Sequence, residues 1–182
     1  IFAVGGPVGV RCDKNGSCSG ALPTDPAIDQ LAVWGTRDHL WVVADKGAMQ
    51  HYKLRARDLP ELAQPSLAPQ KALSSVWVNS QGVAWAAGDA GAVVRCTPGT
   101  PDACTSIMSG TSEDFSKVRG DGQDNAWVLG SQGAVLKCGG SSCSPLATQA
   151  GGADYDVWFG PNGTAWIVAA AGVLECQAGA AT

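Results

Sequence analysis

The chain has 182 residues, of which 45% are hydrophobic, and it carries a formal net charge of −4. This length and composition suffice for one domain with a core of its own. The negative charge argues against a nucleic-acid-binding surface, because phosphates are neutralised by clustered lysines and arginines. No stretch of 18 or more apolar residues occurs, so the sequence predicts no direct membrane span.

One pattern recurs five times along the chain: a strand ending in Val-Trp, a polar turn, an Ala-Trp strand, a glycine, and a strand ending in Cys. The aromatic residue of the second strand marks each copy, at spacings of 39, 44, 42 and 39 residues: Phe2, Trp41, Trp85, Trp127 and Trp166. A period of about forty residues that alternates strands and turns is typical of propeller blades. The sequence therefore predicts an all-β fold, a β-propeller of four-stranded antiparallel blades.

The expected units of this single propeller domain follow in chain order. They are a partial blade at 1–25, complete blades at 31–73, 74–110 and 115–149, and a partial blade at 154–182. The second strand at 126–130 is apolar at its first four positions, as expected for a strand buried on both faces. Both partial units hold the second and third strands, so they do not complement each other. This favours a segment of a larger propeller, with a five-unit ring with imperfect end blades as the alternative.

One unit departs from the repeat between its third strand and the next blade. Residues 53–70 include three prolines and no cysteine, and they are expected to form a long connection. Long connections on a repeat scaffold often carry function, but we favour the interpretation of this one as an insertion tolerated at the rim.

Three cysteine pairs bracket short turns between expected third and fourth strands: Cys12 with Cys18, Cys96 with Cys104, and Cys138 with Cys143. We interpret them as disulfides, with buried thiols as the alternative. Zinc is disfavoured, because the gaps of 5, 7 and 4 residues do not match zinc ligand pairs and no histidine lies near. Disulfides indicate an extracellular, periplasmic or cell-surface location. Cys176 is the odd cysteine, and its partner is expected beyond Thr182.

The unit Val-Trp, x-Gly-x-Ala-Trp, Val-x-Gly-x-x-Gly-x-Val resembles the repeats of BNR-like and photosystem-assembly-factor-like propellers, within the WD40/YVTN superfamily. The resemblance covers nearly the whole chain. The repeats of this chain lack the Asp-box S-x-D-x-G-x-T-W of sialidase-type propellers and the Gly-His and Trp-Asp signatures of WD40 blades. It implies an architecture and not a function, because such folds host many unrelated activities.

Motifs for catalysis are missing from the sequence. No G-x-S-x-G, P-loop or G-x-G-x-x-G is present, and no cofactor is expected. Were the chain a glycoside hydrolase, its carboxylates would have to face the channel, and Asp114, Asp121 and Asp156 are the candidates.

Arg119 is the most unusual residue of the repeat, because it occupies the slot filled elsewhere by Trp34, Trp77 and Trp158. It is a possible contact for an anionic ligand, and a salt bridge to a carboxylate is the alternative. A second set precedes the third-strand cysteine or its equivalent, and we interpret it as a solvated face: Arg11, His51, Arg95, Lys137 and Glu175. His39 and His51 are interpreted as ordinary strand or turn residues.

The turn at 121–125 clusters side-chain oxygens but lacks the longer ligand series of a calcium loop, so we predict no metal site there. Asn15 and Asn162 begin Asn-Gly-Ser and Asn-Gly-Thr sequons and are possible glycosylation sites, although Asn-Gly is also a favoured turn.

The sequence thus favours an exported, non-enzymatic propeller that binds a protein partner or serves in a surface assembly. A carbohydrate-active propeller, either a lectin or a glycoside hydrolase, is the alternative, which keeps glycans among the possible ligands.

Overall fold

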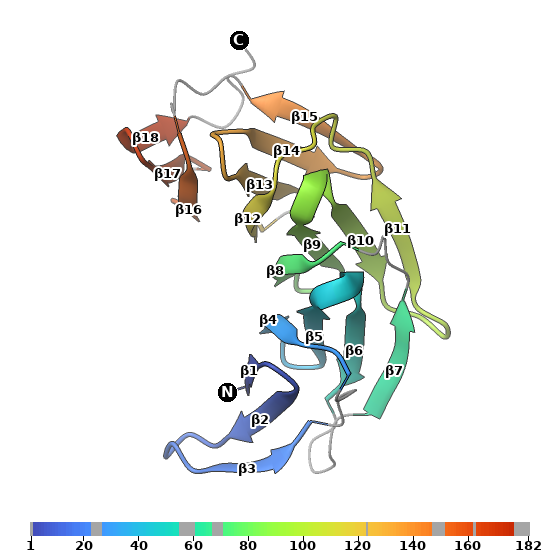
Figure 1. Ribbon diagram of the computed structural model, residues 1–182. Helices are drawn as coiled ribbons and strands as arrows, with labels where there is room; N and C mark the ends of the chain where they lie inside the picture. Colours follow the sequence, from blue (N-terminus) through green and yellow to red (C-terminus); the bar gives the residue numbers. More distant parts are fainter. Residues whose placement is uncertain are drawn as a thin grey trace.

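The computed structural model describes residues 2–22, 27–54, 61–66, 71–122, 124–146, 152–161 and 163–176. Among these described residues, the regular elements are β-strands and two short 3-10 turns. The strands form five antiparallel sheets that follow one another along the chain and fan out along an arc (Figure 1).

Each sheet is a meander in which neighbours in sequence are also hydrogen-bonded neighbours in space. The first sheet contains β1 (Phe2–Gly5), β2 (Val8–Cys12) and β3 (Cys18–Ala21). The second contains β4 (Gln30–Gly35), β5 (His39–Ala44), β6 (Met49–Lys53) and β7 (Glu61–Ser66), with η1 (Asp45–Gly47) between β5 and β6.

The third and fourth sheets are complete four-stranded units. The third contains β8 (Leu73–Val78), β9 (Ala84–Gly88), η2 (Asp89–Gly91), β10 (Val93–Thr97) and β11 (Ala103–Ile107). The fourth contains β12 (Phe115–Gly120), β13 (Ala126–Gly130), β14 (Val135–Gly139) and β15 (Ser142–Leu146). The fifth contains β16 (Asp154–Phe159), β17 (Ala165–Ala169) and β18 (Gly172–Cys176).

The second, third and fourth sheets have the four-stranded antiparallel architecture of propeller blades, and the first and fifth have three strands among the described residues. The structure differs from the sequence prediction after the second sheet's third strand. Residues 61–66, expected to belong to a long connection, form the fourth strand β7 paired with β6. Leu73, expected to end the second blade, instead begins β8. The prolines obscured β7 because they interrupt the hydrophobic alternation that marks a strand.

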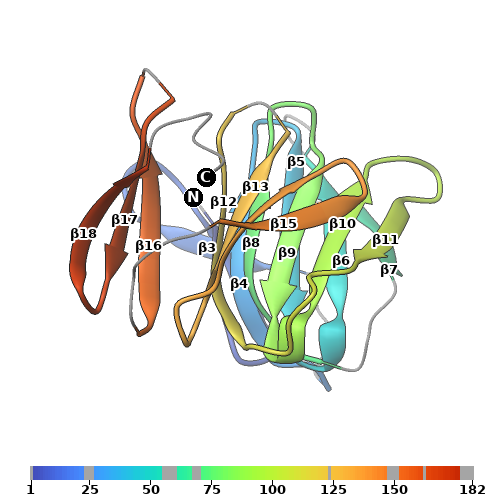
Figure 2. The same cartoon turned by 90° about the horizontal axis from the view of Figure 1, so that it is seen from above.

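The first strand of each later sheet lies on the inner, concave side of the arc. Strands β4, β8, β12 and β16 contact one another in sequence, while β7, β11 and β15 lie at the outside (Figure 1). Seen from above, the outer strand β15 is rotated strongly relative to the inner strand β12, which is the usual twist of a β-sheet (Figure 2). The inner strands of successive sheets therefore lie side by side along the concave side of the arc.

Four hydrophobic clusters fill the interfaces between successive sheets. The middle strands β9 and β13 are buried at every position, as predicted for second strands packed on both faces. Ser75 Oγ adds a polar link between inner strands, because it accepts a hydrogen bond from the Val118 N–H at 3.1 Å. Burial on two faces explains why the middle strands show no alternation of polar and apolar residues.

One close approach between sheets requires a glycine. A Cβ added to Gly120, at the end of β12, would lie 2.0 Å from Cη2 of Trp77 on β8. The Trp77 ring thus covers the backbone of the next sheet, and only 8% of this residue is exposed. Gly120 lets the inner strands of neighbouring sheets come together around a large aromatic side chain.

Candidate functional site

Each second-strand aromatic residue lies opposite a polar residue of the third strand. The pairs are Phe2 with Arg11, Trp41 with His51, Trp85 with Arg95, Trp127 with Lys137, and Trp166 with Glu175. The interpretation of these polar residues as a solvated face is wrong at His51, which is fully buried. The same interpretation holds only in part at Arg95, whose side chain is 25% exposed. At these two positions the polar side chain finds a carboxylate on the following sheet.

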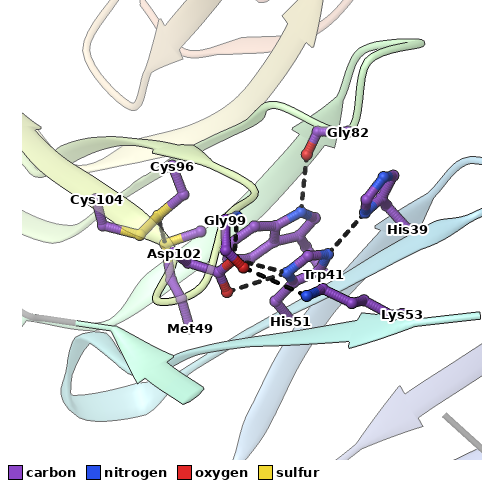
Figure 3. Close-up of polar contacts among 10 residues, drawn as sticks. All are labelled: His39, Trp41, Met49, His51, Lys53, Gly82, Cys96, Gly99, Asp102 and Cys104. Carbon is purple, nitrogen blue, oxygen red and sulfur yellow. Dashed lines mark hydrogen bonds and ion pairs between the residues drawn. A yellow bond between two sulfur atoms is a disulfide. The ribbon is translucent and has the colours of Figure 1, made fainter. Parts of the chain in front are cut away.

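His51 is the centre of a chain of three polar side chains between the second and third sheets (Figure 3). Its Nδ1 lies 3.0 and 3.1 Å from the two carboxylate oxygens of Asp102, in the β10–β11 turn. Its Nε2 lies 2.9 Å from Nδ1 of His39, at the start of β5. The Asp102 side chain is 1% exposed, whereas His39 is half-buried. Of these three hydrogen-bonded side chains, His39 is therefore the one that solvent reaches.

The His51 ring also stacks on Trp41, with a centroid separation of 4.2 Å and an interplanar angle of 4°. Burial lowers the pKa of His51 below its ordinary value, and Asp102 partly opposes this by favouring the charged form. His39 and Lys53 lower this pKa further through charge repulsion, as smaller contributions. His51 is therefore a neutral imidazole at neutral pH.

Further contacts hold the β10–β11 turn against the second sheet. The Gly99 N–H donates to Asp102 Oδ1 at 2.9 Å, and Lys53 Nζ donates to the Gly99 carbonyl at 3.3 Å. The Trp41 Nε1–H donates to the Gly82 carbonyl at 3.0 Å, in the β8–β9 turn. The second and third sheets are thus joined at this face by a polar network as well as by a hydrophobic core (Figure 3).

The next interface has a related arrangement built on an arginine. Arg95 lies 2.7 Å from Asp124 Oδ2, with its guanidinium 5.7 Å from the centroid of the Trp85 ring. Asn79 Nδ2 donates to the other carboxylate oxygen at 3.0 Å, and Trp85 Nε1 lies 3.4 Å from it. Asp102 and Asp124 could not be recognised as partners from the sequence, because both are turn residues on a neighbouring sheet.

Arg119, expected from the sequence to contact an anionic ligand or a carboxylate, lies on the inner strand β12. Its guanidinium carbon is 4.8 Å from the centroid of the Trp34 ring, and its Nε is 3.5 Å from Asp156 Oδ1. Its side chain is 26% exposed and that of Asp156 is 49% exposed. The inner strands β4, β12 and β16 therefore each contribute one member of a partly exposed group, Trp34, Arg119 and Asp156.

Trp34 also forms one wall of a pocket of about 410 Å³. The lining residues come from the first two sheets: Phe2, Val33, Trp34, Gly35, Thr36 and Leu40. Trp34 is 37% exposed, whereas the equivalent Trp77 is 8% exposed. The fourth sheet has Gly120, whose backbone lies close to the Trp77 ring, where the third sheet has Val78. Trp34 thus combines an apolar wall with a platform for a cation, an arrangement suited to ligand binding.

A second hollow, of about 540 Å³, lies near η2 and is lined mainly by the 107–112 segment with Lys71. Met108 is 86% exposed there. Lys71 Nζ is hydrogen-bonded to the Ala90 carbonyl at 2.8 Å, and the rest of the lining is mostly small residues. This hollow has fewer anchoring side chains than the pocket beside Trp34.

The candidate catalytic aspartates serve local structure. Asp114 Oδ1 accepts a hydrogen bond from the Ala90 N–H at 2.7 Å, and Asp121 Oδ2 accepts one from Asn125 Nδ2 at 2.8 Å. Asp114 precedes β12 and Asp121 follows it, which separates them by about 20 Å of extended chain. The structure therefore does not bring these two carboxylates together, and Asp156 pairs with Arg119 instead. No group of three or more metal-ligating side chains lies close together among the described residues.

Three disulfides join the last two strands of a sheet, Cys12–Cys18 between β2 and β3, Cys96–Cys104 between β10 and β11, and Cys138–Cys143 between β14 and β15. They fit a protein of an oxidising compartment. Cys176 ends β18 and packs half-buried against the core between the fourth and fifth sheets.

Of the two possible glycosylation sites, Asn15 is exposed in the β2–β3 turn, and Asn162 lies outside the described residues. The described part of the chain contains no helix long and apolar enough to cross a membrane.

Comparisons with known proteins identify the fold. No family model and no curated protein matches the sequence. A protein of unknown function from Bacteroides caccae superposes with a TM-score of 0.70 at 12% identity, over 100% of this chain and 69% of that one. YCF48 from Cyanidioschyzon merolae superposes with a TM-score of 0.71 at 16% identity, over 100% and 64%.

The extracellular domain of the putative hybrid two component system BT4673 from B. thetaiotaomicron gives a TM-score of 0.65 at 10% identity, over 96% of this chain and 26% of that one. The chain thus spans about two thirds of the length of the first two structures and a quarter of the third. Identities this low establish a shared architecture only. The chain has the β-propeller fold expected from its resemblance to photosystem-assembly-factor-like repeats.

Proposed function

We propose that this chain is an exported, non-enzymatic propeller that binds a segment of another protein in the pocket beside Trp34. The observation that carries the proposal is the position of Trp34, which lines an apolar pocket on one side and lies under Arg119 on the other. Tryptophan and arginine are enriched among the residues that dominate protein–protein affinity. Phe2, Val33 and Leu40 extend the apolar wall, which suits an apolar side chain of the partner.

Export is supported by the disulfides, because such bonds persist in oxidising compartments. The same architecture occurs in an extracellular domain of a bacterial two component system. We therefore assign the chain to the periplasm, the cell surface or the extracellular space, where its partner is a protein or a surface assembly.

A carbohydrate ligand is the second candidate, and the exposed rings of the inner strands favour it. Trp34 is 37% exposed and Trp158 is 62% exposed, and flat aromatic faces of this kind can stack on sugar rings. Asp156 would supply the carboxylate for sugar hydroxyls or for hydrolysis.

A selection from a random peptide library displayed on phage distinguishes these functions. The wild-type chain is expected to enrich peptides that share an apolar residue, and Trp34→Ala and Arg119→Gln are expected to lose the enriched peptides. Lys14→Gln, which removes an exposed cation from the β2–β3 turn, is the control that keeps them. Failure to enrich any peptide, or equal binding by all variants, contradicts the proposal.

A glycan array and a hydrolysis screen test the second candidate in parallel. Glycan binding lost in Trp34→Ala would replace the protein partner with a lectin function. Turnover lost in Asp156→Asn would make the chain an enzyme and overturn the non-enzymatic part of the proposal.

A further inference from the structure

We propose that the partner segment binds as an extra β-strand along β1 and inserts an aromatic side chain into the pocket beside Trp34. This inference rests on the proposed function, because it specifies how a segment of another protein occupies that pocket. It adds main-chain hydrogen bonds and a strand register to the apolar contact proposed above.

The first sheet presents an open strand edge next to this pocket. Phe2 stands at the repeat position of Trp85 and Trp127, so β1 corresponds to the second strand of a blade. In each later sheet a first strand pairs with the second strand on its inner side. Among the described residues no strand pairs with β1 on this side, and Gly6 just beyond its end forms a single bridge to Gln30 of β4. A segment of another protein can therefore add to the sheet along β1.

The pocket repeats the surroundings of Trp77, which is buried near the end of the first strand β8. The residues around Trp77 come from the second strand of its own sheet and from the next sheet: Trp85, Val118, Gly120 and Ala126. The residues at the same repeat positions of the first two sheets all line the pocket: Phe2, Val33, Gly35 and Leu40. Because Trp77 lies opposite Trp85 across the strand pair, the residue of an added strand that enters the pocket lies opposite Phe2.

The kind of side chain that fits the pocket follows from Leu40. Its Cδ1 would lie 2.9 Å from a Cβ added to Gly35, so it occupies part of the floor of the pocket. The later sheets have alanine at this position: Ala84, Ala126 and Ala165. The pocket of about 410 Å³ is therefore narrower at its floor than the site of Trp77, and it suits the single ring of phenylalanine better than an indole.

The hydrogen-bond directions of the fourth sheet indicate how the added strand pairs with β1. The N–H of Val118 donates to Ser75 Oγ on β8, so it does not point toward β13. Opposite residues of an antiparallel pair alternate between hydrogen-bonded and non-hydrogen-bonded, so Trp127, one position along, belongs to a hydrogen-bonded pair with β12. Phe2 stands at the position of Trp127 and therefore turns its N–H and C=O toward the open edge. Val4, two residues on, does the same.

A synthetic peptide with the sequence of β8, and with phenylalanine in place of its tryptophan, is the probe. It reads Leu-Ser-Ser-Val-Phe-Val, with a lysine added at each end and both termini blocked. Added to the ¹⁵N-labelled wild-type chain, it is expected to shift the indole N–H signal of Trp34 and to slow the hydrogen exchange of the Val4 amide. Replacing its phenylalanine by alanine should weaken the binding by about fivefold or more.

Two N-methylated forms of this peptide separate strand addition from insertion of a side chain alone. N-methylation of its phenylalanine removes the N–H that donates to the Phe2 carbonyl, and it should weaken the binding by about fivefold or more. N-methylation of the preceding valine is the matched control, because that N–H points away from β1. This second peptide should bind almost as well as the unmodified one.

The outcomes distinguish this inference from the proposed function. Equal binding of the two N-methylated peptides, with a shift of the Trp34 signal, overturns strand addition and leaves the proposed function standing. If the unmodified peptide leaves the Trp34 signal in place, strand addition is also wrong, whereas the library selection decides the proposed function. A dimer of two copies paired through β1 that excludes the peptide, detected by light scattering, likewise overturns the inference.

Discussion

Replacing Gly120 by alanine tests how closely the inner strands of neighbouring sheets approach. The new Cβ would lie 2.0, 2.1 and 2.3 Å from three carbons of the Trp77 ring. Carbon atoms in contact are normally about 3.5 to 4.0 Å apart, so the ring and the backbone must separate by roughly 1.5 Å. Trp77 is 8% exposed and has little room to turn away. Gly120→Ala is therefore expected to lower the free energy of unfolding by about 1–3 kcal/mol.

Urea unfolding followed by tryptophan fluorescence measures this loss, and thermal unfolding should show a drop of roughly 2 to 12 °C. Gly5→Ala is the matched control at a strand end, because nothing lies within 4 Å of its added Cβ. Trp77→Leu should remove most of the penalty of Gly120→Ala, giving a coupling of about 1 kcal/mol or more in a double-mutant cycle. Additive effects, or an unchanged Gly120→Ala, would refute this packing between sheets.

Three further predictions concern the pH dependence of stability, the pKa of His51 and the disulfides. The pKa of His51 lies below its ordinary value of 6.5, so the folded protein binds fewer protons than the unfolded protein. Its contribution to stability is present above pH 6.5 and is lost as the pH falls through the lowered pKa, which urea unfolding at several pH values would detect in wild type and not in His51→Gln. Asp102→Asn should lower the pKa of His51 further, as an NMR titration would show. Replacing Cys138 and Cys143 by serine should cost about 2 kcal/mol, and intact mass should rise by about two units per disulfide on reduction of the unfolded wild type.

The repeat unit predicts the fold well, because the hydrogen bonds that define a blade join residues of the same unit. The all-apolar strand around Trp127 indicates burial on two faces, and the structure has that strand buried throughout. The paired spacing of Cys138 and Cys143 likewise matches the strand register, which places the two residues opposite each other. Hydrogen-bonding neighbours within a blade are close in sequence, so local pattern is enough to place them.

Contacts between blades were not predictable in the same way. His51 looked like an exposed strand residue, because its partner Asp102 lies 51 positions away in a turn of the next sheet. The ion pair between Arg95 and Asp124 was missed for the same reason, because the two residues belong to different sheets. Turn chemistry alone accounts for an aspartate in a turn, so nothing local marks it as an ion-pair partner. The candidate site depends on how sheets pack, and the sequence of one unit does not encode that packing.

The indole N–H signals of the seven tryptophans offer the most direct test of the proposed function. When a selected peptide is added to ¹⁵N-labelled protein, the Trp34 signal should shift, and the buried Trp85 signal should stay in place. Arg119→Gln should weaken the binding by about fivefold or more, which corresponds to a contribution of roughly 1 kcal/mol or more. Shifts confined to Trp158 and Trp166, with unchanged affinity in Arg119→Gln, would contradict a binding site beside Trp34.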